Sequence, residues 1–449
     1  MSKDIKFKKG LKLKLKGAAT TQLKDAPRSS TYALIPDNFH ATVPKLLLKD
    51  GAKVQAGEAI FYSKLDKDVQ FVSPVSGTIK EVRRGAKRKI LEIVIEADVQ
   101  DSYKNFDVKP LDTAGRDDVK ATLLESGCWP FIIQRPYSIV AESDKTPKAI
   151  FISAYASAPL AADLDFIIAQ KRAAFETGLK ALTKLTDGKV VLGVAKNSPL
   201  KSINIEGVEV VSVSGPYPAG NVGMLIHKLN PVNAGERVWT VGAEDVAIIG
   251  NVFSQGKFIA ERTVAFCGQA SPEDKRVYYK SIIGASVASI TDINSPDVRL
   301  ISGDVFTGDK VAQGEHLNFY KNELTAIPEG KNYRMFGWIP FTHNNIPSVA
   351  GTSLSRFFTG KKHEVNTNLN GEERALVVTG EMESVMPMDV FPMQLLKACL
   401  TGDIEKMENL GIYEVAPEDF AVIDYVNTSK IEAQVIIRAG LDTMLTEVG

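Results

Sequence analysis

One glycine-rich run has the composition of a phosphate-binding turn. Residues 215–223 read Gly-Pro-Tyr-Pro-Ala-Gly-Asn-Val-Gly, which places Gly215, Gly220 and Gly223 between a predicted strand and a predicted helix. Glycine allows close approach to the backbone, and the N-terminus of a helix favours an anion. The run is neither GxGxxG nor a P-loop, because no Lys-Ser/Thr pair follows it, and its prolines remove N–H donors. We therefore expect a vestigial nucleotide loop or a tight structural turn, with a bound nucleotide as the alternative.

Lys67 could carry a covalent cofactor. Residues 43–96 hold short predicted strands separated by glycine turns, and they resemble the barrel-sandwich hybrid of biotinyl and lipoyl domains. In lipoyl domains the modified lysine follows an aspartate at a hairpin tip, a few residues before Ser-Pro. Here Asp66-Lys67 precedes Pro74 at a similar spacing, but the flanking SKLDKDVQ departs from the modified pattern. We expect a barrel without a swinging arm, with a lipoyl-type carrier as the alternative.

Histidines and cysteines do not form a recognisable metal site in the sequence. The five histidines show no ligand spacing, and the three cysteines, Cys128, Cys267 and Cys399, contain no CxxC pair. Three cysteines cannot supply four thiolates to an iron–sulfur cluster, and their scatter is typical of a reducing compartment. His227, four residues after Gly223, is predicted to be a packed or capping residue. No motif of a hydrolase, zinc enzyme or nucleic-acid-binding protein is present, so no catalytic or metal-ligating residue is predicted.

The zero net charge of the 449 residues conceals a strong asymmetry. Residues 1–100 carry 20 Lys and Arg against 11 Asp and Glu, whereas residues 381–449 carry 4 against 13. Such polarity favours docking on charged surfaces, although a solvated charged face is the simpler explanation. No run approaches the ~18 apolar residues of a membrane span, and the basic N-terminus lacks the apolar core of a signal peptide. We expect a chain that stays in the cytoplasm or lies on a membrane without crossing it.

The N-terminal residues 5–15, IKFKKGLKLKL, alternate apolar side chains with lysine, with a slip at Lys9-Gly10. This period predicts a strand with one buried face and one lysine-rich face. Two interpretations stay open: an edge strand protected by lysines, or an electrostatic contact with phospholipid head groups.

The remaining pattern predicts a multidomain α/β chain. Predicted strands at 148–155, 188–196 and 208–215 alternate with helices at 163–182 and 221–229, which favours a Rossmann-like sheet. A small α+β unit follows, with strands at 261–268 and 298–308 and a helix at 284–292, and the chain ends in helices from 387. We predict the following division: 1–105, a barrel-sandwich hybrid with an N-terminal strand; 106–254, Rossmann-like; 255–330, an α+β unit of ubiquitin-like or SLBB type; 331–380, a connecting segment; 381–449, a helical bundle.

Several stretches, in one order along the whole chain, resemble a known family. They are SPVSGTIKEVRRGAKR at 73–88, LESGCWPFIIQRPYS at 124–138, GPYPAGNVGMLIHKLNPV at 215–232, VRLISGDVFTG at 298–308, FGW at 336–338, ESVMPMDVFPMQLL at 383–396 and KMENLGIYEVAPEDFAV at 406–422. They look like the A-subunit family of the sodium-translocating NADH:quinone oxidoreductase, which is itself similar to the flavoprotein subunit of respiratory complex I and to a ferredoxin:NAD oxidoreductase subunit.

The departures from those wider relatives concern their cofactors. The relatives hold FMN with a glycine-rich run where this chain has bulky Trp129, Phe131 and Ile132, and they carry cluster cysteines in C-terminal helices that lack cysteine here. The resemblance therefore implies a subunit without its own redox cofactor, at the cytoplasmic face of the bacterial inner membrane. It implies that NADH, FAD, FMN, riboflavin, Fe-S and quinone are used on the other five membrane and flavin subunits. The whole complex would reduce quinone to quinol while it exports Na+.

Any quinone contact made by this chain is expected in the segment Trp129–Tyr137. Trp129, Phe131 and Tyr137 could form the walls of a site for a flat ring, and Arg135 could donate to a quinone oxygen. The prolines predict an irregular loop there. The alternative is that these aromatic residues fill the former flavin pocket as core. A standalone nucleotide-dependent oxidoreductase that uses residues 215–223 is the rival function.

Overall fold

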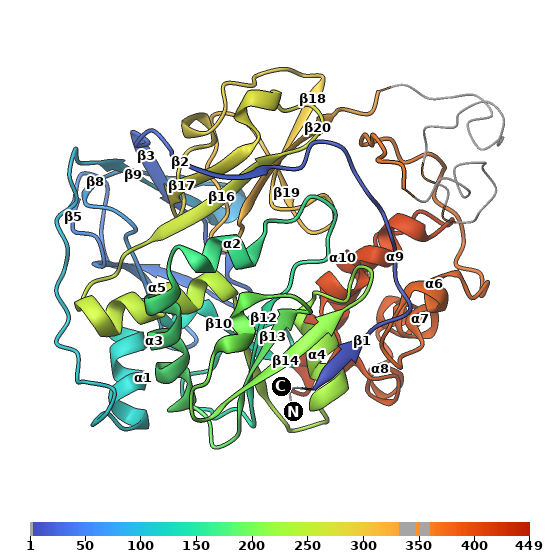
Figure 1. Cartoon of the computed structure of the whole chain (residues 1–449), viewed down its shortest axis with the longest axis horizontal. Helices are drawn as coiled ribbons and strands as arrows, with labels where there is room; N and C mark the ends of the chain where they lie inside the picture. The colour runs from blue at the N-terminus through green and yellow to red at the C-terminus, as the bar shows by residue number, and fades with distance from the viewer. Residues whose placement is uncertain (1–2, 332–346, 348, 350–359) are drawn as a thin grey trace.

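The centre of the chain is a seven-stranded, mostly parallel sheet (Figure 1). The computed structural model describes residues 3–331, 347, 349 and 360–449. The strand order is β1 (Asp4–Lys6), β14 (Val208–Ser214), β13 (Val190–Ala195), β12 (Ile150–Ala154), β15 (Val238–Val241), β10 (Ile132–Arg135) and β11 (Ile139–Val140). Within this sheet only β10 runs against the other strands, and it pairs antiparallel with both β15 and β11. The three strands predicted from 148 to 215 are confirmed.

Alternate residues of this sheet enter two different cores. Ile150 and Ile152 of β12 face a core shared with α3 (Arg172–Thr183) and α5 (Ala243–Gln255), whereas Phe151 faces α4 (Val222–Leu229) and the C-terminal helices. A parallel sheet buried on both faces needs such continuous apolar strands. The helix predicted over 163–182 is wrong in its continuity. It divides into α2 (Leu164–Ala169) and α3, because Lys171 between them leaves helical geometry.

The N-terminal β domain consists of two small facing sheets. One contains β3 (Thr31–Leu34), β9 (Ile90–Ala97), β8 (Gly77–Arg84) and β5 (Lys53–Val54), and the other β4 (Pro44–Leu46), β6 (Ala59–Ser63) and β7 (Gln70–Val72). Their core includes the stacked rings of Phe61 and Phe71, whose centroids lie 4.4 Å apart. α1 (Arg116–Glu125) then leads into the central sheet.

The N-terminal strand lies outside this β domain, with which the sequence pattern had grouped it. β1 pairs in parallel with β14 at the edge of the central sheet, and β2 (Thr20–Asp25) pairs with β17 (Val277–Ile282) in a third sheet. The physical reason is that Phe7 buries its ring in the core between the central sheet and the C-terminal helices. The residues between β1 and β2 therefore run along the outside of the C-terminal helices (Figure 1).

The third sheet has the order β19 (Asp309–Val311), β18 (Val298–Ser302), β20 (Glu323–Pro328), β16 (Glu261–Cys267), β17 and β2. The predicted strands near 261 and 298 are confirmed. The helix predicted over 284–292 is wrong, because only Val287–Ser289 form a single 3-10 turn. This stretch instead makes bridges and backbone hydrogen bonds to β3 and to residues 315–317, which replace those of a helix.

The chain ends in short helices, as predicted: α6 (Glu381–Val385), α7 (Pro392–Thr401), α8 (Ile404–Asn409), α9 (Ala421–Val426) and α10 (Ala433–Glu447). They pack beside α4 and β1, at the right in Figure 1, and share one core with a face of the central sheet. Within the described ranges, no helix is both long and apolar enough to span a bilayer. The FGW stretch at 336–338 lies outside the described residues.

Candidate functional site

Three segments that are distant in the sequence meet at one buried position, which we name the interdomain junction. Arg135 ends β10, Tyr217 and Asn221 belong to the glycine-rich loop before α4, and Glu418 and Asp419 lie in the 3-10 turn Pro417–Phe420 before α9. Each segment comes from a stretch that carried the family resemblance. The junction thus connects the central sheet to the C-terminal helices.

Proline and aspartate define the turn that brings the acids to the junction. Pro417 occupies its first position, where a missing N–H costs nothing, and the Asp419 carboxylate accepts from the backbone N–H of Ala416 at 3.0 Å. The same carboxylate is fully buried. A buried carboxylate requires compensating donors, and the junction supplies them.

Arg135 is the main donor. Its Nη1 lies 3.1 Å from Asp419 Oδ2, and its Nη2 lies 2.7 Å from Glu418 Oε1. Only 2% of the Arg135 side chain is exposed, against 43% for Glu418. Burial alone would lower the pKa of Arg135, but Asp419 and Glu418 more than offset this and hold it above its usual value. The guanidinium is therefore a permanent buried cation.

The glycine-rich loop surrounds this acid pair instead of an open cleft. The Asn221 amide donates to the carbonyl of Glu418 at 3.0 Å and to Asp419 Oδ1 at 3.4 Å. A Cβ atom added to Gly223 would stand 2.5 Å from Asp419 Oδ2, and one added to Gly220 would stand 2.4 Å from the carbonyl oxygen of Tyr155. Gly215, at φ +152°, likewise packs against the backbone of Phe7. The close approach that glycine allows is used here by protein atoms.

The chemistry of the junction is that of an anion site. A buried guanidinium, a side-chain amide and the positive end of α4 would suit a phosphate or carboxylate group. The anion present is the carboxylate of Asp419, which belongs to the C-terminal region of the same chain. An external anion could enter only by displacing it.

The aromatic residues expected to contact quinone are all buried. Trp129 donates to the carbonyl of Ala141 at 2.7 Å and packs edge-on against Trp239, with centroids 5.3 Å apart. Phe131 stacks on Phe319, and their ring centroids lie 5.0 Å apart. Trp129, Phe131 and Tyr137 are 0%, 1% and 6% exposed. Of these residues, the structure brings only Arg135 to the junction. Trp129 and Phe131 belong to the core that includes α3 and α5.

The irregular loop predicted for this segment is wrong in part. Trp129–Phe131 form a 3-10 turn, and Ile132–Arg135 form β10, which pairs with β15 over its full length. Pro136 follows the strand and ends its pairing, so the proline acts after the strand and does not disrupt it. Tyr137 adopts a positive φ of 78° beside the Tyr413 ring, and its carbonyl accepts from Arg438 at 2.7 Å.

His227 also links the central sheet to the C-terminal helices. Its Nε2 accepts from the backbone N–H of Asp389 at 3.2 Å, so Nδ1 carries the proton and donates to Glu414 Oε2 at 2.8 Å. The prediction of a packed or capping histidine is confirmed.

Lys67 lies at the tip of the β6–β7 hairpin with its side chain exposed. The neighbouring Asp66 accepts from the backbone N–H of Ser143 at 3.0 Å, which fastens the tip to the following domain. A swinging arm normally needs a free tip. The hairpin tip is therefore held at Asp66, while the Lys67 side chain extends into solvent.

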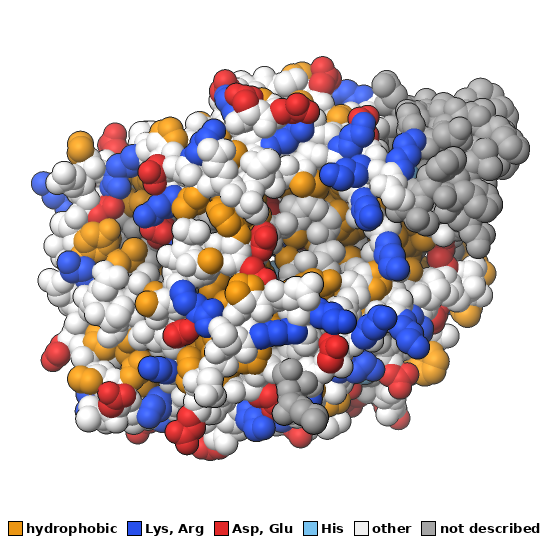
Figure 2. Space-filling view, viewed as in Figure 1, with side chains coloured by type: hydrophobic (Ala, Val, Ile, Leu, Met, Phe, Trp, Pro, Cys, Tyr) orange, Lys and Arg blue, Asp and Glu red, His pale blue; other side chains and the backbone are white. Residues whose placement is uncertain are grey.

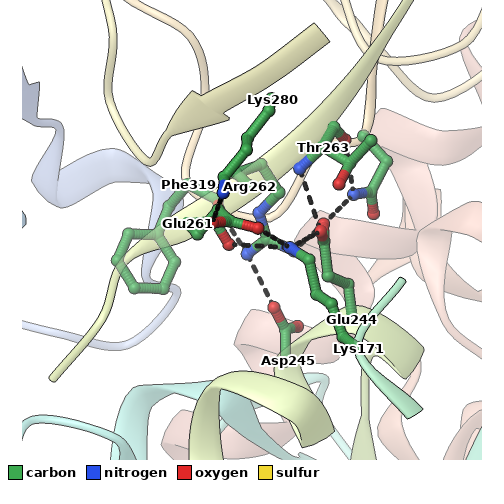
Figure 3. A network of polar contacts seen from close by, with 9 residues as sticks. Lys171, Glu244, Asp245, Glu261, Arg262, Thr263, Lys280 and Phe319 are labelled. Atoms are coloured by element: carbon green, nitrogen blue, oxygen red, sulfur yellow. Dashed lines mark hydrogen bonds and ion pairs between the residues drawn. The ribbon is translucent and has the colours of Figure 1, made fainter. Parts of the chain in front are cut away.

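A second polar network joins α5 and the start of α3, which pack on the central sheet, to β16 of the third sheet (Figure 3). Arg262 donates to Asp245 at 2.6 Å and lies 3.4 Å from Glu244, while Lys171 donates to Glu244 at 2.5 Å and pairs with Glu261 at 3.1 Å. Burial raises the pKa of Asp245, whereas Lys171 and Arg262 lower that of Glu244 despite its burial. Lys280 pairs with Glu261 at 2.9 Å, so three cations face three carboxylates, as expected of a structural interface.

Sequence reasoning missed Glu418, Asp419 and this second network. Arg135 and Asp419 are 284 positions apart, and no local period marks an acid that will be buried. The one available signal was that both lie in stretches of family resemblance. Among the described residues, no group of three or more His, Cys, Asp or Glu side chains is placed to hold a metal ion.

Comparison with known proteins agrees with this organisation. A family model described as the NqrA N-terminal barrel-sandwich hybrid domain matches residues 5–98, and one described as the NqrA second alpha/beta domain matches residues 114–258. A protein of a NAD+-reducing nickel–iron hydrogenase aligns over 75% of this chain and 64% of its own at a TM-score of 0.35 and 9% identity, a likeness too weak to inform the function.

Relatives that match over almost their whole length carry the assignment. The A subunit of the Na(+)-translocating NADH-quinone reductase of Saccharophagus degradans is 35% identical over 97% of this chain and 98% of its own. Its counterpart in Neisseria meningitidis is 34% identical over 99% of this chain and 100% of its own length. The counterpart in Yersinia pestis is 35% identical over 97% of this chain and 98% of its own length. The chain belongs to the A-subunit family of the Na+-translocating NADH-quinone reductase.

Proposed function

We propose that this chain is a cofactor-free peripheral component of a membrane-bound, sodium-exporting NADH:quinone reductase. In this role it supports the step in which quinone becomes quinol, while partner subunits hold the flavins and iron–sulfur groups. The proposal places it with the other five subunits, on the cytoplasmic face of the bacterial inner membrane. The family assignment supports the complex, and the junction supports the absence of a nucleotide.

The observation that carries the cofactor-free role is the position of Asp419. Its carboxylate stands against Gly223 at the N-terminus of α4 and pairs with Arg135, where these groups would favour a phosphate. We regard the loop as vestigial for this reason. The bulky, fully buried Trp129 and Phe131 support the same view of the former flavin region.

The proposal extends to the domain organisation. The mostly parallel sheet supports a Rossmann-like domain over 106–254, and the mixed sheet with its short 3-10 turns supports a ubiquitin-like or SLBB type of domain over 255–330. Residues 381–449 would form a helical bundle with its own link to the central sheet through Asp419 and His227.

The segment Trp129–Tyr137 is proposed to act on quinone reduction through packing and not by contact. Its aromatic side chains touch one another and neighbouring strands, and Arg135 is already paired. Direct quinone contact, the sequence-based expectation, would require this core to open. Substituting Arg135 and Tyr137 together distinguishes the two roles: contact predicts a raised KM for quinone in an intact complex, whereas packing predicts lost stability with an unchanged KM.

The test of the cofactor-free role is a binding measurement on the purified chain. Its visible spectrum should lack flavin and iron absorption, and titration with FMN or NADH should show no saturable binding at concentrations up to about 1 mM, the upper range of typical substrate affinities. Stoichiometric flavin, or tight binding that Gly223→Val abolishes, would favour the standalone oxidoreductase.

A further inference from the structure

We infer that five lysines of the N-terminal segment form a docking surface for the anionic head groups of phospholipids. We name Lys6, Lys8, Lys9, Lys12 and Lys14 the lysine row. All five side chains are exposed, whereas Phe7 and Leu15 of the same segment are only 4% and 5% exposed. The alternation turns apolar residues inward and lysines outward, as one face of a strand requires.

The backbone of the segment is held in place along its length. β1 pairs with β14, the N–H of Leu11 donates to the carbonyl of Tyr217 at 2.8 Å, and the N–H of Lys16 donates to the carbonyl of His363 at 3.0 Å. From Lys6 to Lys14 the chain spans at most about 26 Å at ~3.3 Å per residue, because it bends at Lys9 and Gly10. The row is therefore a fixed ridge of positive charge and not a loose tail.

The charge of the row is not neutralised within the described part of the chain. Glu209 pairs with Lys3 before the row, and Glu364 pairs with Lys16 after it. Between these points Lys9 is the one lysine whose ammonium makes a hydrogen bond to a described residue, and its acceptor is the backbone carbonyl of Glu383. Figure 2 shows Lys and Arg side chains following the path of this segment over the C-terminal helices. Clusters of this size are what anionic leaflets attract.

The residue type favours lipid over a protein partner. The first 27 residues contain eight lysines and no arginine. Arginine binds carboxylates with a rigid fork and is enriched at protein interfaces, where lysine is depleted. Lysine is a flexible point charge, which suits head groups that present no fixed geometry. An acidic protein segment is the alternative occupant.

The inference rests on the proposed membrane-peripheral role, but it can be tested on the isolated full-length chain. Binding to phosphatidylcholine vesicles with and without phosphatidylglycerol is measured by co-sedimentation. The row variant carries Lys6→Gln, Lys8→Gln, Lys12→Gln and Lys14→Gln. The control changes four equally exposed lysines of the β domain: Lys49→Gln, Lys53→Gln, Lys64→Gln and Lys80→Gln. A third variant places arginine at the four row positions.

We expect the wild type to bind only vesicles that contain phosphatidylglycerol and to be released at roughly 1 M salt, where the Debye length is about 3 Å. The row variant should bind on the order of a hundredfold or more weakly, while the control and the arginine variant stay close to the wild type. The inference is wrong if the wild type ignores anionic vesicles, or if the control loses as much as the row variant. If the row variant binds vesicles normally but fails to join the complex, the row is a protein-docking surface. If the wild-type chain restores quinone reduction to the complex but does not bind anionic vesicles, the proposed function stands and only this inference is overturned.

Discussion

Replacing Asp419 with alanine should loosen the C-terminal helices from the central sheet. The carboxylate is fully buried and accepts from Arg135 at 3.1 Å and from Ala416 at 3.0 Å. Its removal leaves the Arg135 guanidinium buried with Glu418 as its remaining acid partner. Breaking a buried ion pair by deleting one partner costs about 3–5 kcal/mol. Because Glu418 stays at 2.7 Å, we expect the lower end, about 3 kcal/mol.

Glu418 supplies the matched control, since it contacts the same guanidinium but its side chain is 43% exposed. Solvent screens such a pair, so Glu418→Gln should cost only about 0.5–1 kcal/mol. The double variant Arg135→Met, Asp419→Leu removes both buried charges and should lie within about 1 kcal/mol of the wild type. A double-mutant cycle built from this variant and the single variants Arg135→Met and Asp419→Leu should then give an interaction free energy between the two side chains of about 2 kcal/mol or more.

The assay is thermal and urea unfolding followed by tryptophan fluorescence. Trp129 and Trp239 contact each other next to the strand that ends in Arg135, and Trp338→Phe leaves these two as the only emitters. A free energy of unfolding lower by about 3 kcal/mol corresponds to a Tm lower by roughly 6–12 °C for a cooperative unit of about 150–250 residues. A structural role of Asp419 is refuted if Asp419→Ala costs no more than Glu418→Gln, or if the cycle shows no coupling.

Three further predictions follow from the other regions. Burial raises the pKa of Cys128 and Cys267 to about 12 and that of Cys399 to about 11. The native chain should therefore react slowly with a thiol reagent near pH 8, and the partly exposed Cys399 should react first. Rapid labelling of Cys128 would contradict its burial. Arg299 and Thr367 lower the pKa of Glu329 to about 2 from the usual 4.5, so its stabilising contribution is present above pH 4.5 and is lost as the pH falls towards 2. The Tm difference between the wild type and Glu329→Gln should therefore shrink over that range, and a difference that grows on acidification would have the wrong sign. Lys67 should be unmodified, so the intact mass should match the sequence, and a lipoyl or biotinyl increment would overturn this prediction.

The buried strands and α4 could be predicted from the sequence. β12, β13 and β14 are short apolar runs between turn signals, as strands covered on both faces are, and α4 follows the helical period of about 3.6 residues. The lysine alternation likewise indicated the buried and exposed faces of the N-terminal segment. Its sheet could not be predicted, because the partner of an edge strand is set by tertiary packing of Phe7 and not by the strand itself.

The junction shows what single-sequence reasoning lacks. Gly215, Gly220 and Gly223 correctly marked places of close approach, but nothing local indicated that the approaching groups would be Phe7, Tyr155 and Asp419, respectively. Arg135 and Asp419 lie 284 positions apart in the sequence, and only the fold brings them together. The helix prediction for residues 284–292 is wrong for a related reason. Backbone hydrogen bonds to β3 and to residues 315–317 override the helical pattern of this stretch.

The proposed role of this chain is to support quinone reduction within the complex without carrying electrons itself. The most direct measurement is reconstitution of membranes that contain the partner subunits of the complex but lack this one. Purified chain, shown by absorbance to be free of flavin and iron, is added, and NADH oxidation is followed with quinone and with an artificial electron acceptor. We predict that NADH-to-quinone activity and Na+ uptake into inverted vesicles return, while the artificial-acceptor activity is the same with and without the chain. Full quinone reduction in its absence, or restoration only when the added chain carries bound flavin, would contradict this role.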